Sequence, residues 1–64
     1  MDYIRSYYRV PAKRGGRVIY HDGPTDRSGV ITSALGALGQ YLRIRLDGRA
    51  RSDIFHPTWG ITYL

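Results

Sequence analysis

The sequence contains no cysteine and no glutamate, and Lys13 is its only lysine. The absence of cysteine excludes disulfide frameworks and thiolate zinc sites, and it fits a reducing compartment, so we expect a cytoplasmic location. Its apolar runs are short, far below the roughly 20 residues needed to cross a bilayer, and the N-terminus lacks the basic and apolar regions of a signal peptide. We therefore expect no membrane partner.

Residue types that carry catalysis are also scarce. His21 and His56 are the only candidates for a general base near neutral pH, and no serine lies in a nucleophile motif. His56 with Asp53 or Asp22 makes at most a dyad, without a third group to act on a substrate. The histidines and aspartates also lack the spacing of metal ligands. We predict no enzyme, no catalytic residue, no metal site and no cofactor.

What the chain does have is positive charge. Nine of its ten cations are arginine, all five acids are aspartate, and the formal net charge is +5. This balance favours polyanionic partners, because the planar guanidinium matches phosphate and stacks on aromatic rings. The alternative is that the excess charge only keeps the protein soluble. With 64 residues the chain forms one domain, which buries only roughly 60% of its unfolded surface.

The first segment, residues 2–9, is predicted to be a short helix. Its apolar residues Tyr3, Ile4, Tyr7 and Tyr8 fall on one helical stripe. Asp2 is a candidate cap for the start, and the residues 10–11 (Val-Pro) end the helix. Since so short a helix is marginal alone, we expect the stripe to pack on the core.

Short apolar segments follow, separated by turn-forming residues. Residues 41–47 give the clearest strand, with strict alternation that predicts Leu42, Ile44 and Leu46 on the buried side. Tyr41, Arg43, Arg45 and Asp47 then lie on the exposed side. The other predicted strands or short apolar pieces are residues 17–20, 29–34, 54–55 and 61–64, and residues 21–28 are predicted to be an exposed loop.

Several short strands at close spacing are typical of a small barrel or sandwich. We predict a mostly β fold: a small barrel of about five short strands with a short N-terminal helix, whose closure would remove exposed strand edges. The whole chain, residues 1–64, forms a single domain. Within it, residues 1–12 are a helical segment packed on the barrel, and residues 13–64 form the barrel.

Three stretches, residues 14–18, 28–31 and 41–48, resemble the SH3-like small-barrel superfamily, and more narrowly its KOW- and Tudor-like members. The shared pattern is a glycine before the first strand, a second strand opening with glycine, and a third ending in Asp-Gly. Residues 10–15 and 56–59 are also similar to short proteins of phage and prophage genomes. The resemblance implies binding to RNA, DNA, ribosomal surfaces or peptides, and it does not choose among these ligands.

The basic residues near the predicted strands form the main candidate site. Arginine neutralises phosphate and tyrosine stacks a base, so such a face is suited to single-stranded DNA or RNA, or to a nucleoprotein. Exposed arginines also discourage strand aggregation, which is the purely structural alternative. The predicted nucleic-acid-binding residues are Lys13, Arg14, Arg17, Tyr41, Arg43, Arg45, Arg49 and Arg51.

Residues 56–59 (His-Pro-Thr-Trp) form a second candidate site. We expect Trp59 to plug the open end of the barrel, with Pro57 fixing its approach. The alternative is that His56, Pro57 and Trp59 form an interaction pad for a protein partner, or for self-association in a virion-structural module. The oligomeric state remains open at this point.

Overall fold

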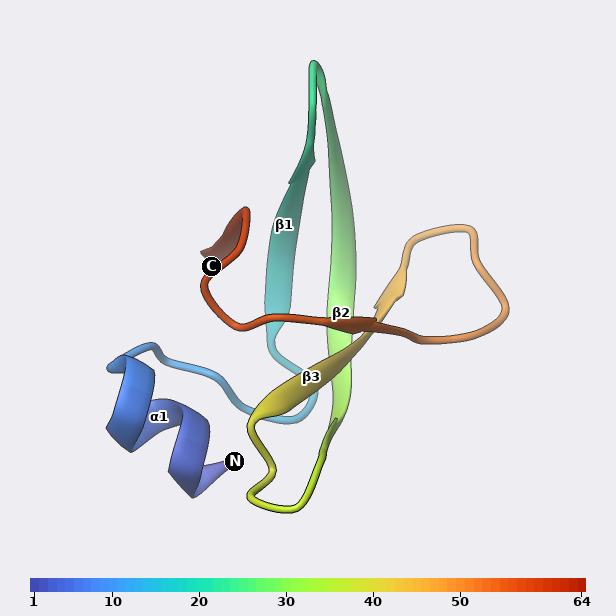
Figure 1. Cartoon of the computed structure of the whole chain (residues 1–64). Coiled ribbons are helices and arrows are strands. Elements are labelled where there is room, and N and C mark those ends of the chain that lie inside the picture. Colours follow the sequence, from blue (N-terminus) through green and yellow to red (C-terminus); the bar gives the residue numbers. More distant parts are fainter.

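The computed structural model describes residues 1–64 as one short helix and five antiparallel strands (Figure 1). The strands form a single sheet in the order β4-β3-β2-β1-β5. This confirms the predicted mostly β fold of about five short strands with an N-terminal helix. The elements are α1 (Asp2–Tyr8), β1 (Arg17–Asp22), β2 (Thr25–Leu35), β3 (Tyr41–Leu46), β4 (Asp53–Phe55) and β5 (Ile61–Tyr63).

The sheet is curled but not closed by hydrogen bonds. β1 to β4 form a meander, and β5 returns to pair with β1, which leaves β4 and β5 at opposite edges. Curling brings the rings of Tyr20 on β1 and Phe55 on β4 to 4.8 Å in an edge-to-face contact. The segment after β4 runs across the sheet toward β5 (Figure 1). This segment, rather than a strand ladder, spans the gap between the edges.

The core is small and entirely hydrophobic. Leu42 and Ile44 of β3 are fully buried and Leu46 nearly so, while the residues between them are exposed, which confirms the alternation predicted from the sequence. Half-buried side chains such as Phe55 and Tyr63 surround this core. Its buried hydrophobic members are Ile4, Ala12, Val18, Ile31, Leu42, Ile44 and Leu46.

Gly29 allows β2 to approach β3 closely. A Cβ atom at this position would lie 2.9 Å from Cγ2 of Ile44 and 3.0 Å from the carbonyl oxygen of Arg45. Such distances are shorter than van der Waals contact, so any side chain would force the two strands apart. The glycine at the start of the predicted second strand is therefore required by packing.

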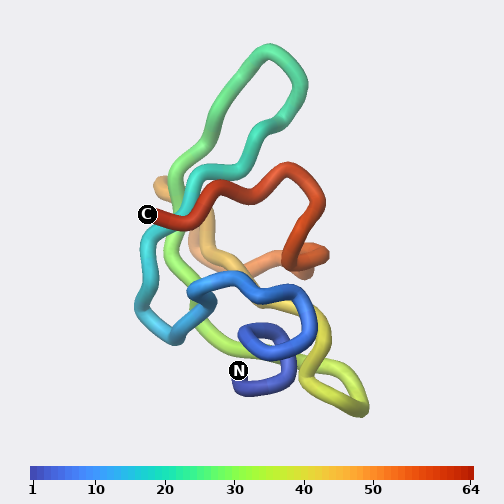
Figure 2. Tube along the Cα trace, turned by 90° about the vertical axis from the view of Figure 1, so that its left-hand side faces the viewer, coloured from blue at the N-terminus to red at the C-terminus, as the bar shows by residue number.

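The predicted loop over residues 21–28 is wrong. These residues form the outer half of the β1–β2 hairpin, in which His21 pairs with Asp26 and Asp22 with Thr25. All are exposed, and the arm projects from the end of the molecule away from α1 (Figure 2). A strand that is exposed on both faces lacks an alternating apolar pattern. Because this segment is rich in turn-forming residues, the sequence predicts a loop where the backbone pairs as a strand.

The helix α1 is confirmed, but two details of the prediction are wrong. Asp2 does not cap the helix; Met1 holds that position without a side-chain hydrogen bond, and Asp2 pairs with Arg5 instead. Of the predicted apolar stripe only Ile4 is fully buried, and Tyr7 is 67% exposed. Two turns of helix present too narrow a face to bury four large side chains. No helix has the length and apolar content needed to span a membrane.

Candidate nucleic-acid interface

The exposed face of β3 carries Tyr41, Arg43 and Arg45. They occupy alternate positions of the strand, so neighbouring members lie about 7 Å apart along it. Neither arginine has an ion-pair partner. On the adjacent β2, Arg45 stands opposite Val30 and Arg43 opposite Ser33, so no acidic side chain faces them across that ladder. Asp47 follows Arg45 on the same side, and its pKa is lowered mainly by its hydrogen bond with Arg17 and to a lesser degree by the charge of Arg45, but neither Arg43 nor Arg45 forms an ion pair with it.

A β-bulge shapes β2 beside this face. The pairing with β3 shifts between Ile31 and Ser33, which leaves Thr32 as the extra residue. The Thr32 hydroxyl donates to the carbonyl of Arg43 at 3.2 Å and contacts the Ser52 hydroxyl at 2.8 Å. These contacts attach the β3–β4 loop to the sheet next to Arg43. The loop extends away from α1 (Figure 1) and carries two further predicted residues, Arg49 and Arg51, both exposed.

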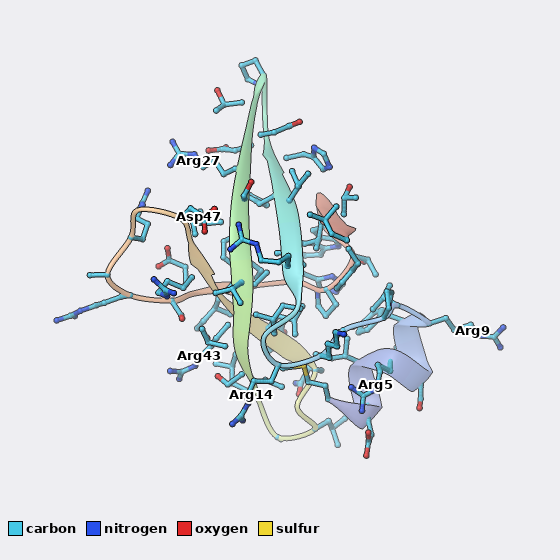
Figure 3. All side chains as sticks on the ribbon, turned by 180° about the vertical axis from the view of Figure 1, so that it is seen from behind. Arg5, Arg9, Arg14, Arg27, Arg43 and Asp47 are labelled. Atoms are coloured by element: carbon cyan, nitrogen blue, oxygen red, sulfur yellow. The ribbon has the colours of Figure 1, made fainter.

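The connector before β1 supplies cations on the other side of β2. The amide of Gly15 donates to the carbonyl of Ile31 at 2.8 Å, and the Ile31 amide donates to Gly16 at 2.9 Å, so this connector lies along β2. Arg14 and Arg43 extend at the same end of the sheet in Figure 3, well away from Arg9 on the helix. Lys13 is exposed beside Arg14.

Arg17 differs from the other predicted binding residues because its charge is compensated. Its guanidinium donates two hydrogen bonds to the carboxylate of Asp47, at 2.7 and 3.2 Å. These bonds hold the pKa of Asp47 below its usual range and raise the pKa of Arg17. Arg5 and Arg27 likewise pair with aspartates. The cations without an ion-pair partner are Arg9, Lys13, Arg14, Arg43, Arg45, Arg49 and Arg51.

An aromatic cluster lies next to Tyr41, centred on His56. The imidazole stacks on the indole of Trp59 with 4.2 Å between ring centroids and 13° between planes, and it meets Tyr8 edge-on at 5.2 Å. Tyr41 is 6.5 Å from the same imidazole. The cluster thus continues from the exposed face of β3 toward α1, where Tyr8 in turn contacts Tyr7.

The hydrogen bonds of His56 fix its ring orientation. The backbone N–H of Thr58 donates to Nδ1 at 3.2 Å, so in the neutral ring the proton is on Nε2, which faces the Tyr8 hydroxyl at 3.4 Å. Burial is the main cause that raises the pKa of the Tyr8 phenol, and the neighbouring tyrosines add to it. The dyads of His56 with Asp53 or Asp22 are not formed, because its ring bonds only Tyr8 and Thr58.

The expected role of Trp59 as a plug is wrong. Its side chain is 71% exposed, whereas the neighbouring Pro57 is buried. The Tyr63 hydroxyl donates to the carbonyl of Pro57 at 2.6 Å, which fixes this segment to β5. The bond leaves Trp59 outside the core, on the surface of the cluster. Periodicity could not reveal this, since it does not say which residue of an irregular segment turns inward.

The burial of Tyr63 makes stability sensitive to alkaline pH. Burial raises the pKa of Tyr63 from about 10 to about 12, so the folded state favours the protonated phenol. Its contribution to stability is complete below about pH 10 and is lost as the pH rises toward about 12. We expect the free energy of unfolding, measured with urea, to fall across this range. The fall should be smaller in Tyr63→Phe; an equal fall in both proteins would contradict the assignment.

One hydrogen-bond network was not predicted. The Asp26 carboxylate accepts from Nδ1 of His21 at 2.9 Å, and Nε2 lies 2.6 Å from the Thr62 hydroxyl. The order of groups is that of a hydroxyl–imidazole–carboxylate relay. Here it lies on the exposed surface and connects the hairpin arm to β5. Thr62 is too far from His21 in the sequence for spacing to reveal their contact, whereas the hairpin register brings His21 opposite Asp26.

No group of three or more metal-ligating side chains comes together in the structure. Comparisons with protein-family models, with curated proteins and with solved structures found no match to this chain.

Proposed function

We propose that this chain is a non-enzymatic binding module that holds single-stranded DNA or RNA, free or in a nucleoprotein, on the exposed face of β3. The observation that carries the proposal is the row of Tyr41, Arg43 and Arg45, whose two guanidinium groups have no acidic partner. Phosphates can bind the guanidinium groups while a base stacks on the tyrosine ring. Arg14, Lys13 and the arginines of the β3–β4 loop extend the positive surface on either side.

The resemblance to SH3-like small barrels and to phage or prophage proteins belongs to the same proposal, and it rests on the sequence pattern. The second candidate is a protein-interaction or virion-structural module. The exposed indole of Trp59 and the exposed ring of Tyr7 favour it, because large apolar rings are common in protein interfaces. The two candidates differ in their response to salt. Phosphate binding weakens steeply with ionic strength, whereas an apolar interface does not.

Substitutions on β3 test the proposal. Arg43→Ala and Arg45→Ala are each expected to weaken oligonucleotide binding and to reduce the slope of log affinity against log salt by up to about one. Tyr41→Ala should cost roughly 1–3 kcal/mol of binding free energy and leave the slope unchanged, because stacking releases no counterions. The measurement is a fluorescence titration with a labelled single-stranded oligonucleotide at several salt concentrations.

Arg9→Asn is the matched control. Arg9 is also exposed and unpaired, but it ends α1 in a left-handed conformation (φ 55), which asparagine tolerates. The substitution removes the same charge at a distance from β3 (Figure 3). If it weakens binding as much as Arg43→Ala, only net charge matters and the site is not on β3. If the folded protein binds no oligonucleotide at low salt, the proposed function is wrong.

A further inference from the structure

Trp59 is held in a fixed orientation although most of its surface is exposed. One face of the indole stacks on the His56 ring, with 4.2 Å between the ring centroids. The backbone N–H of Trp59 donates to the carbonyl of His56 at 3.2 Å. The buried Pro57 and its bond from Tyr63 anchor the same segment. The second face of the indole has no aromatic partner. A large apolar ring held in place at the surface is suited to binding, since little conformational freedom remains to be lost.

The position of this ring continues the proposed binding face. Leu42 of β3 pairs with Phe55, the last residue of β4. Tyr41 and His56, the next residue outward on each side, therefore stand opposite each other. Their rings lie 6.5 Å apart, and Trp59 stacks on His56. From Arg45 to Tyr41 the strand rises about 13 Å, and the His56–Trp59 stack lies beside the Tyr41 end of this row. A ligand that follows the arginines thus meets first Tyr41 and then the indole.

The charge around the stack suits a polyanion. Four of the five aspartates are engaged with cations or with His21 elsewhere on the surface. The fifth, Asp53, pairs across from Ile44 and lies at the end of β4 away from His56. No carboxylate belongs to the aromatic cluster, so a phosphate chain passing from Arg43 toward Trp59 meets no opposing charge.

We infer that the His56–Trp59 stack is a second base-stacking platform for the same ligand. The inference rests on the proposed function and specifies its substrate: a single strand long enough to occupy β3 and the stack together, at the short end of the roughly 4–16 nucleotides that such small domains cover. Unpaired bases are required, because a ring can stack on the indole only when the base is free of its own neighbours.

The test uses oligothymidylates, from the dinucleotide to the octanucleotide, titrated into the full chain at low salt. Trp59 is the only tryptophan, so its emission reports the stack directly. We expect emission to be quenched by the longer oligonucleotides and not by the dinucleotide. Affinity should rise with length until both platforms are occupied. Trp59→Ala should lower the affinity for the octanucleotide by about 5- to 150-fold. The difference in affinity between the octanucleotide and the dinucleotide should then largely disappear.

Leu64→Ala is the control, because Leu64 is as exposed as Trp59 and lies outside the cluster. The inference is overturned, with the proposed function intact, if Arg43→Ala weakens binding while Trp59→Ala does not and emission stays constant. It is also overturned if emission changes with protein concentration alone and Trp59→Ala abolishes self-association, since the ring then packs on a second copy. Absence of all oligonucleotide binding refutes the proposed function itself.

Discussion

Ile44→Ala is expected to lower the free energy of unfolding by about 2–5 kcal/mol. The side chain is fully buried at the centre of β3, where it pairs with Ile31 of β2 and contacts the space that Gly29 leaves open. The truncation removes apolar contacts and leaves a cavity that a sheet of paired strands cannot easily collapse. A chain of this length has a total stability of roughly 3–10 kcal/mol, so the substitution removes a large share of it.

The matched control is Ile54→Ala on the neighbouring β4. Ile54 is 63% exposed and lies opposite Arg43, so its truncation should change the free energy of unfolding by less than about 0.5 kcal/mol. Urea unfolding followed by circular dichroism measures both variants. An unchanged midpoint for Ile44→Ala would mean that the buried side of β3 is assigned wrongly.

Ile4→Ala is the second substitution with a large expected effect, again about 2–5 kcal/mol. Ile4 is the only fully buried residue of α1, and it belongs to the same hydrophobic cluster as Val18 and Leu42. Loss of this contact should therefore destabilise the sheet as well as the helix. Ser6→Ala changes an exposed position of the same helix and should leave stability nearly unchanged.

Amide hydrogen exchange distinguishes the two ways in which Ile4→Ala could act. If helix and sheet unfold as one unit, protection should fall together in residues 2–8 and in β3. Loss of protection in the helix alone, with β3 as protected as before, would show that α1 is a separable attachment. The bond from Arg5 to the carbonyl of Ala12, at 2.7 Å, would then be insufficient to couple the helix to the core.

The sequence predicts the parts of this fold in which a repeating pattern reflects burial. β3 alternates strictly because one face lies on the core, and its exposed row, Tyr41, Arg43 and Arg45, follows from the same pattern. The spacing of the apolar residues correctly predicts the helix. It overestimates how much of the helix contacts the core, because spacing does not give the width of the core surface on which the helix packs. Ile4 is the only fully buried member of the stripe, Tyr8 packs against the core while only partly buried, and Tyr7 remains exposed.

The remaining features depend on contacts between residues that are distant in the sequence. Whether Arg17 carries free charge is decided by Asp47, thirty positions later. The exposure of Trp59 depends on Pro57 turning inward to meet Tyr63. The outer hairpin has no apolar face at all, so composition suggested a loop where backbone pairing forms a strand.

The chemical nature of the cations on β3 has a consequence for regulation. Arg43 and Arg45 both carry a guanidinium group, a type of side chain that proteins do not deprotonate. Arg17 remains compensated in mild acid, because its bonds keep Asp47 ionised to lower pH. Acidification of a compartment would leave the charge of this row unaltered. Ionic strength, or a competing polyanion, is then the variable that releases a phosphate ligand from it.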